Sequence, residues 1–243
     1  MRLDLLQVDF LAPLFLVGAW TGYALYADGG RRQTLMARMR DYRLAWMRQM
    51  MVRDNRIVDT QITSLLVQNI SFFASSAILL IGGLVAILGA REQAMAIIAD
   101  IPLAAATPAG LWEIKVLLLA LIFVYAFFKF TWSLRQFNYV AILIGATPPP
   151  EEAGSQSMTW HIERTASVAS RAADHFNKAM RAYYFGLAAL SWFVHPWLLV
   201  AATLWVLVVN WRREFRSHSY MLLGEAGEPV DGPQGRPDQQ ESP

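Results

Sequence analysis

Hydrophobic residues are gathered into long blocks along this chain, and polar residues fill the segments between the blocks. No charged residue occurs from position 65 to position 89, and a helix over these 25 residues is about 37 Å long. A helix of that length crosses a bilayer with some tilt. Comparable blocks cover residues 8–26, 112–132 and 183–211. The pattern predicts an all-α integral membrane protein, a bundle of four transmembrane helices that forms a single domain over residues 1–223.

Residues 31–58 have the spacing of an amphipathic helix rather than of a membrane span. Their apolar side chains recur at intervals of three and four, and the other face is strongly basic. Such a helix suits the cytoplasmic headgroup region, where its arginines contact anionic lipid headgroups. A calmodulin-like target or a specific anionic-lipid site is the alternative. The arginines are Arg31, Arg32, Arg38, Arg40, Arg43, Arg48, Arg53 and Arg56.

Residues 160–181 form a second amphipathic segment. Ala166, Ala169 and Ala173 lie at the centre of a seam with heptad-type spacing, which suits tight packing against another helix, such as the one over residues 31–58. The remaining segments are expected to be connections. Residues 147–159 are a linker by composition, and residues 91–111 contain two prolines that disfavour a continuous helix.

The fourth apolar block is interrupted by His195 and Pro196, and a proline kinks or breaks a helix. One interpretation is a long kinked span with His195 near mid-membrane, and the other is a hairpin of two short helices. With a single span and the N-terminus outside, 13 Lys and Arg residues lie inside and six outside, as the positive-inside rule favours. The hairpin improves this distribution to 17 against two. Its arms, 12 and 15 residues, are short for two spans, so a single kinked span is expected.

Composition narrows the classes of function. The chain is 55% hydrophobic and 16% charged, and it has no cysteine, which excludes disulfides, thiolate metal sites and cysteine nucleophiles. No GxSxG, P-loop or HExxH motif occurs. His161 and His175 are about 21 Å apart on one helix, too far to share a metal ion. Nucleic-acid binding is not expected, because the arginines alternate with apolar residues and no nucleic-acid motif accompanies them. Residues 224–243 hold five acidic residues among Gly and Pro and are expected to be disordered.

Polar residues inside the apolar blocks are the candidate functional residues. Gln61, Gln68 and Ser75 lie on one face of the second span, with Asn69 beside them. Amides in hydrocarbon need partners, so this face is expected to contact other helices or water, either as interhelical hydrogen bonds or as a polar path. His195, beside the helix-breaking proline, is either a functional group or a neutral ring bonded to a freed carbonyl.

The third span carries Lys115 near one end and Lys129 near the other. Lysines at such positions extend their amines to the membrane surface, so neither is expected to form a proton path.

Three short stretches of the chain resemble the DUF599 family of membrane proteins. They are residues 59–69 (DTQITSLLVQN), 133–139 (SLRQFNY) and 181–185 (RAYYF). The resemblance covers most of residues 14–216 and implies a four-span membrane protein of a family found in bacteria and plants. It implies no activity, because none is established for the family. The family's motifs point to Gln61, Asn69, Arg135, Asn138 and Tyr183.

These observations predict a non-enzymatic accessory or scaffold protein of the bacterial inner membrane, with the N-terminus outside. No cofactor or metal is expected. The alternative is a small transporter or channel for an ion or small solute, which would need a homo-oligomer, because four spans enclose little pathway. The sequence identifies no protein partner.

Overall fold

The computed structural model describes residues 2–29, 34–102, 104–105, 107–152 and 154–225. These residues fold into helices, with no strand among them. The predicted disordered tail lies outside the described residues apart from its first two positions, which end a helix, and Arg31 and Arg32 also lie outside them. The helices are α1 (Arg2–Asp28), α2 (Leu35–Met51), α3 (Ile57–Gly89), α4 (Arg91–Ala99), α5 (Ala109–Gly145), α6 (Gln156–Leu190), α7 (Pro196–Phe215) and α8 (His218–Glu225), with short 3-10 turns η1 (Pro150–Glu152) and η2 (Ser191–Phe193).

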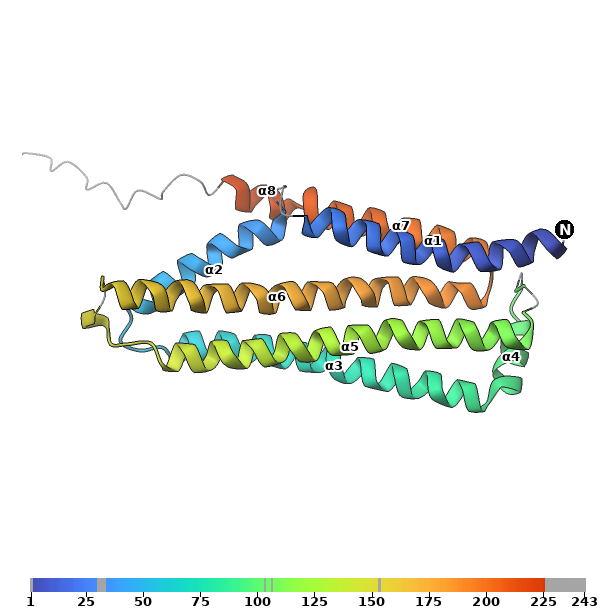
Figure 1. Cartoon of the computed structure of the whole chain (residues 1–243), viewed down its shortest axis with the longest axis horizontal. Coiled ribbons are helices and arrows are strands. Elements are labelled where there is room, and N and C mark those ends of the chain that lie inside the picture. The colour runs from blue at the N-terminus through green and yellow to red at the C-terminus, as the bar shows by residue number, and fades with distance from the viewer. Residues whose placement is uncertain (1, 30–33, 103, 106, 153, 226–243) are drawn as a thin grey trace, which may run out of the picture.

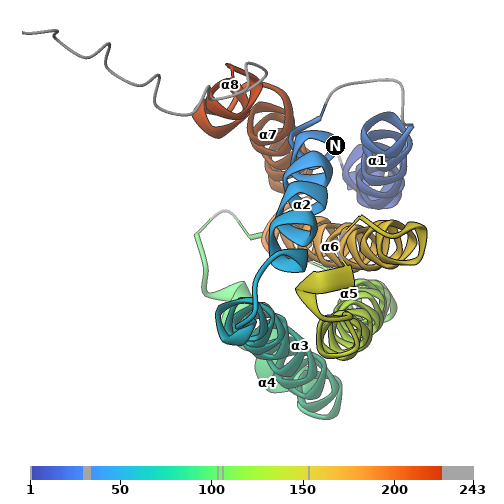
Figure 2. The same cartoon turned by 90° about the vertical axis from the view of Figure 1, so that its left-hand side faces the viewer.

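The helices form an elongated bundle around α6 (Figure 1). One side of α6 packs on α5, and α5 in turn packs on α3. The other side packs on α1 and α7 over one half of its length and on α2 over the other half (Figures 1 and 2). The N-terminus, α4 and the turn from α6 to α7 lie at one end of the bundle, called here the α4 end. The turns from α2 to α3 and from α5 to α6 lie at the opposite end.

Three helices are long and apolar enough to cross a membrane: Gln7–Asp28, Ile57–Gly89 and Ala109–Gly145. They contain the spans expected at 8–26, 65–89 and 112–132. α3 has 33 residues and α5 has 37, so at helical rise they are about 50 and 55 Å long. Both helices therefore extend well beyond a hydrocarbon core of about 30 Å.

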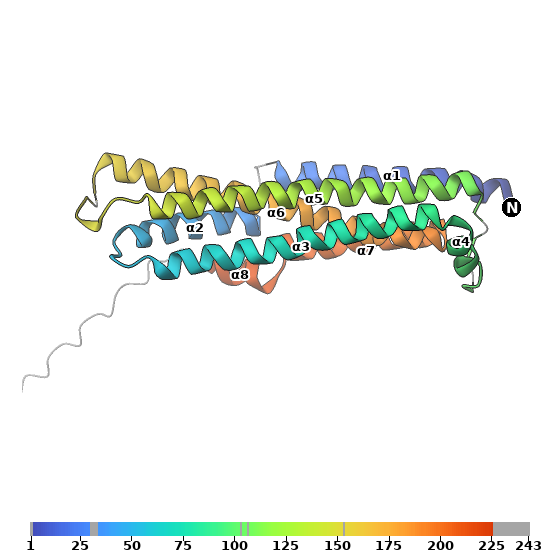
Figure 3. The same cartoon turned by 90° about the horizontal axis from the view of Figure 1, so that it is seen from below.

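The expectation of one kinked span over residues 183–211 is wrong. Residues 182–190 are the end of α6, which runs without a break from Gln156, and the chain reverses so that α7 returns antiparallel to α6 (Figures 1 and 3). Pro196 is the first residue of α7, a position that needs no backbone N–H. The length argument against a hairpin failed because its first arm is not a short helix but the end of a 35-residue one.

Other expected boundaries also shift. Within residues 31–58 the helix covers Leu35–Met51, because Thr34 caps it by accepting a hydrogen bond from the Ala37 N–H. The segment 160–181 is the middle of α6 rather than a separate helix. The connection over residues 91–111 contains the nine-residue helix α4.

Close packing of the long helices depends on aromatic side chains and on one glycine. Phe73, Phe130 and Tyr183 join α3, α5 and α6 in a cluster of ring contacts with centroids 5.7–6.2 Å apart. A Cβ atom on Gly186 of α6 would lie 3.0 Å from Phe123 Cζ, so this glycine lets the Phe123 ring of α5 approach the α6 backbone.

Candidate functional site

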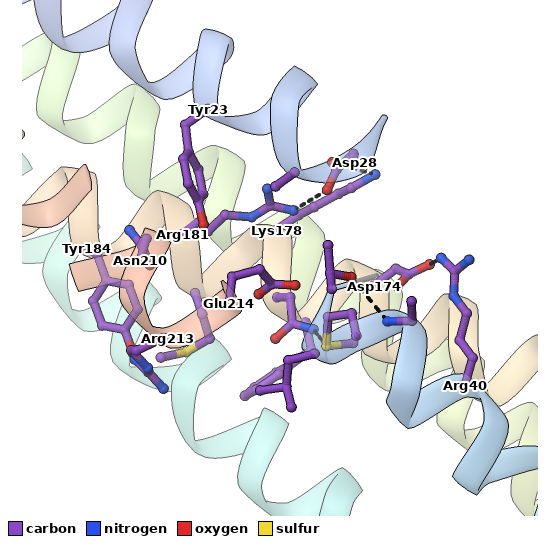
Figure 4. Close-up of a pocket in the computed structure, with 18 residues that line it drawn as sticks. Tyr23, Asp28, Arg40, Asp174, Lys178, Arg181, Tyr184, Asn210, Arg213 and Glu214 are labelled. Atoms are coloured by element: carbon purple, nitrogen blue, oxygen red, sulfur yellow. Dashed lines mark hydrogen bonds and ion pairs between the residues drawn. The ribbon is translucent and has the colours of Figure 1, made fainter. Parts of the chain in front are cut away.

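Four helices meet halfway along the bundle and enclose a cavity of about 330 Å³ (Figure 4). α1 ends there at Asp28, α2 begins there at Leu35, α7 ends there at Phe215, and α6 passes through. The apolar sequences of α1 and α7 both end at this level. The charged residues that follow them therefore lie close together. The labelled lining residues are Tyr23, Asp28, Arg40, Asp174, Lys178, Arg181, Tyr184, Asn210, Arg213 and Glu214.

Most charges in this cavity are paired with one another. Asp28 of α1 accepts from Arg181 of α6, with Nη2 and Oδ1 2.6 Å apart, and its other oxygen is 3.4 Å from Lys178 Nζ. Arg40 of α2 pairs with Asp174 of α6 at 2.8 Å. These contacts tie α1 and α2 to α6.

Two side chains that line the cavity each carry a buried hydrogen-bond donor without a partner among the described residues. These donors are Nη1 of Arg181, whose other terminal nitrogen binds Asp28, and Nδ2 of Asn210. Asn210 is only 7% exposed, although it lies on an otherwise apolar part of α7. Buried polar groups are nearly always hydrogen-bonded, and an unsatisfied one costs about 1–3 kcal/mol. Since both groups are donors, they call for a ligand that supplies acceptor oxygens.

Two further charged groups stand at the end of α7. Arg213 Nη1 donates to the Tyr184 hydroxyl at 2.7 Å, and Arg213 is largely exposed. Burial raises the pKa of Glu214, which lies beyond the apolar stretch of α7, while hydrogen bonds from the Met36 backbone and from Thr34, together with the charge of Arg181, oppose this rise. The Glu214 carboxyl group therefore has partners on α2 and in its cap.

An apolar groove of about 580 Å³ lies beside the cavity, between α6 and α7. Its walls include Leu187, Leu198 and Trp205, with exposed fractions of 49%, 48% and 70%. Tyr184 and Asn210 line both the cavity and the groove. The charged cavity is thus adjacent to an apolar groove along the two helices.

A second charged cluster lies at the α4 end and is closed to solvent. Lys115 of α5 is 1% exposed, and its Nζ is 3.1 Å from Asp9 Oδ1 of α1. The Lys115 amine also donates to the Trp192 carbonyl at 3.0 Å, and the Trp192 indole N–H donates to Asp9 at 2.9 Å. Lys115 does not extend to the membrane surface as expected. It is held inside by the carboxylate of Asp9 and by a carbonyl freed where α6 ends.

At the opposite end, part of the basic segment 31–58 has structural partners. Asp59 is fully buried, and its Oδ1 accepts from Trp46 Nε1 at 2.6 Å and from Arg53 Nη1 at 2.8 Å. Both terminal nitrogens of Arg56 donate to the carbonyls that follow α5, those of Thr147 and Pro148. These contacts fix the turn from α2 to α3 against the end of α5.

The structure does not bring the residues singled out from the sequence into one site. Gln61, Gln68 and Asn69 are exposed on α3, and Arg135 and Asn138 are exposed on α5. The stacked rings of Phe73 and Phe130 set an antiparallel register that puts Gln68 level with Arg135, beyond the span expected at 112–132. Polar groups at that level meet water if the apolar part of α5 lies in the bilayer.

The other two candidates lie elsewhere. Tyr183 belongs to the aromatic cluster of α3, α5 and α6. His195 is not at mid-membrane: it lies in the turn at the α4 end and caps α7, with Nδ1 accepting from the Trp197 N–H at 3.2 Å. The predicted bond to a freed carbonyl is made instead by Lys115.

Sequence reasoning missed the residues that do converge. The signals were an Asp near each end of the first span and an Asn inside the apolar sequence of α7. The described residues contain no group of three or more His, Cys, Asp or Glu placed to hold a metal ion.

Three bilayer-length apolar helices, joined by charged clusters at their ends, are consistent with a multi-pass α-helical membrane protein. The chain belongs to the family described as protein of unknown function, DUF599, whose model matches residues 10–219. The search of curated proteins gave no match. The search of solved structures gave none either.

Proposed function

We propose that this protein is a non-enzymatic accessory protein of the membrane that binds a ligand in the cavity between α1, α2, α6 and α7. The proposal rests on two buried hydrogen-bond donors without acceptors, Arg181 Nη1 and Asn210 Nδ2, which belong to side chains that line one cavity. Binding is favoured over chemistry because the cavity's carboxylates have partners: Asp28 and Asp174 are in ion pairs, and Glu214 has hydrogen bonds on α2 and its cap.

The same proposal includes a topology with five crossings, made by α1, α3, α5, the end of α6, and α7. The N-terminus is outside and the C-terminus inside, in a bacterial inner membrane. The hairpin supports this arrangement, because it returns Arg212, Arg213 and Arg216 to the side that already holds the basic residues of α2. Among the Lys and Arg residues beyond the spans, 17 then lie inside, and only Arg2 and Arg91 lie outside.

Cysteine labelling tests the topology, because the chain has no native cysteine. Single variants Ser157→Cys, Ser219→Cys and Gln93→Cys all place the thiol at an exposed position. In intact cells a membrane-impermeant reagent should label Gln93→Cys alone, and all three after permeabilisation. Labelling of Ser219→Cys in intact cells contradicts the five-crossing arrangement.

Mass spectrometry of the purified, intact protein tests ligand binding. The wild type should retain a non-protein mass, and Asn210→Leu should lose it, whereas the exposed variant Ser219→Ala should keep it. The ligand released by denaturation should be chemically unchanged after incubation with fresh protein. A wild-type protein that carries no adduct and shows no stabilisation by any added ligand contradicts the proposal, and turnover of the ligand contradicts its non-enzymatic part.

A small oligomeric transporter or channel is the second candidate. It draws on the exposed polar face of α3, where Gln61, Gln68 and Ser75 have no neighbouring helix to face. A second copy could cover this face and enclose a polar path. Oxidative crosslinking of Gln68→Cys should then give a dimer, whereas Leu204→Cys, exposed on α7, should not. Proteoliposomes that pass no ion or small solute remove this candidate.

A further inference from the structure

We propose that the charged cavity and the apolar groove form one binding site for a membrane phospholipid. Its phosphate lies in the cavity, at Arg181, Asn210 and Arg213, and one acyl chain lies in the groove between α6 and α7. This inference rests on the proposed function, since it names the class of ligand that the cavity holds.

The two spaces are adjacent and opposite in character. Tyr184 and Asn210 line both of them, so nothing but these two side chains separates the charged end from the apolar end. The cavity walls carry ion pairs, whereas the groove is lined by alkyl and aromatic side chains. A ligand that fills both must itself be polar at one end and apolar at the other.

The free groups of the cavity match a phosphate. Arg181 Nη1 and Asn210 Nδ2 are buried donors without acceptors among the described residues, and Arg213 adds a guanidinium group that donates to the neutral Tyr184 hydroxyl. A phosphodiester offers acceptor oxygens and a negative charge, and arginine binds it with planar, charge-assisted hydrogen bonds. Glu214 also lines the cavity, and hydrogen bonds from Thr34 and the Met36 backbone together with the charge of Arg181 offset the negative charge of its carboxyl group.

The groove has the length and floor that an acyl chain needs. From Leu198 to Asn210 it follows 12 residues of α7, about 18 Å at helical rise. One leaflet of a 30 Å hydrocarbon core is about 15 Å thick, so the groove matches the chain of a lipid in one leaflet. Small residues form its floor, namely Ala188, Ser191, Ala201 and Ala202.

The direction of the site also fits a lipid. The cavity lies where α1 and α7 end, at the edge of their apolar sequence (Figure 4), and the groove runs from there along α7 to Leu198, near the turn at the α4 end. A phospholipid of the leaflet on the α2 side enters this site with its headgroup level with the other headgroups and its chain parallel to the helices.

The test uses the full chain purified in detergent, with dioleoyl phosphatidylglycerol, dioleoylglycerol and inorganic phosphate as separate probes. Affinity is measured by titration in native mass spectrometry and by the shift in unfolding midpoint. Two variants address the two ends of the site: Asn210→Leu removes the buried donor, and Ala202→Trp fills the groove. Val208→Trp is the matched control, because Val208 is 51% exposed on α7 and does not line the groove.

The wild type should bind phosphatidylglycerol at least tenfold more tightly than either dioleoylglycerol or inorganic phosphate. Asn210→Leu and Ala202→Trp should each weaken phosphatidylglycerol binding at least tenfold, and Val208→Trp should leave it within twofold. Ala201→Leu, a smaller obstruction, replaces Ala202→Trp if the tryptophan variant does not elute as a folded protein. Ala201→Leu should likewise weaken phosphatidylglycerol binding at least tenfold.

Two kinds of failure are distinguishable. If inorganic phosphate binds as well as the lipid, or filling the groove changes nothing while Asn210→Leu abolishes binding, the cavity is a ligand site without a lipid chain, and this inference falls alone. If dioleoylglycerol binds as well as phosphatidylglycerol, the phosphate assignment falls. If none of the probes binds and the purified protein carries no adduct, both the inference and the proposed function fall.

Discussion

α1 carries an aspartate near each end, and the two have opposite surroundings. Asp9 is sealed, with its side chain 5% exposed, against a lysine that is 1% exposed. Asp28 is 37% exposed and shares its two oxygens between Arg181 and Lys178 in an open cavity. Both carboxylates are paired. Among the described residues, Arg181, the partner of Asp28, has a buried nitrogen without an acceptor, whereas Lys115 and Trp192, the partners of Asp9, do not.

The difference separates a structural cluster from a candidate site. The Asp9 cluster joins α1 and α5 to the turn between α6 and α7, and its ion pair is closed to solvent. The Asp28 cluster joins α1 to α6 at the wall of a cavity, and Asp28 and Lys178 are each 37% exposed. A change at Asp9 or Lys115 should therefore act on stability, and a change in the cavity should act mainly on binding.

Lys115→Met should have the largest effect. It leaves Asp9 charged and buried with only the Trp192 indole as a partner, and removing one member of a buried ion pair costs about 3–5 kcal/mol. The loss is measured as the change in free energy of unfolding in mixed micelles. Lys129→Met is the control, since Lys129 is in no ion pair that the structure shows and should change stability little.

The double variant Asp9→Leu/Lys115→Met sharpens this result. Replacing both members of a buried pair with apolar residues is often neutral. The double variant should therefore recover most of the stability that Lys115→Met loses. The single variant Asp9→Leu is measured as well. If the loss of stability in the double variant equals the sum of the losses in Asp9→Leu and Lys115→Met, the two residues are not coupled as the 3.1 Å contact requires.

Trp192→Phe should have the next largest effect. It keeps a ring in the buried position but removes the indole N–H that donates to Asp9 at 2.9 Å. Loss of a hydrogen bond to a charged group costs about 1.5–3 kcal/mol, less than the loss of the lysine because Asp9 keeps its ion pair with Lys115. The same unfolding assay measures it, and a variant as unstable as Lys115→Met contradicts this ranking.

Asp28→Asn should change stability by no more than about 1 kcal/mol, because partly exposed ion pairs contribute little. Asp28 and its partner Lys178 are each 37% exposed, so water replaces part of the lost contact. The measurement is again the free energy of unfolding, here at low and at high salt, and the difference from wild type should shrink as salt is added. If Asp28→Asn loses as much stability as Lys115→Met, the ion pairs at both ends of α1 contribute equally to folding, and the proposed difference is wrong.

Asn210→Leu should have the smallest effect on stability in the absence of ligand. Asn210 Nδ2 has no hydrogen-bond partner among the described residues, so an apolar residue of similar size loses no bond there. Thermal unfolding of ligand-free protein should match the wild type or exceed it. A clear loss of stability means that Nδ2 is satisfied by the protein itself rather than by a ligand.

Three of the four predicted spans match helices long and apolar enough to cross a membrane, because lipid-facing helices must be apolar along a bilayer's length and that requirement is local. The prediction failed over residues 183–211, where the structure depends on packing. The apolar end of α6 follows Arg181, whose charge is compensated by Asp28, a residue 153 positions away in the sequence. No local pattern reveals such a partner. The count of basic residues, which favoured the hairpin, was the better guide than segment length.

The candidate site was beyond local reasoning for the same reason. Its residues come from four helices, and each alone looks like a helix end. The polar residues that stood out, such as Gln68 and Arg135, did so because they interrupt apolar sequence, yet the structure leaves them exposed. Asn210 also interrupts apolar sequence, and burial distinguishes it from them.

The unbroken course of α6 has a consequence for biosynthesis. After Arg181 this helix has only nine more residues, about 14 Å, which is half of what a segment needs to enter a bilayer by its own apolarity. In the proposed topology, α6 therefore cannot be integrated when it leaves the ribosome. It must wait for α7 and enter with it, after α1 has supplied Asp28 as a counter-charge. A nascent chain cut before α7 should accordingly leave α6 on the cytoplasmic surface.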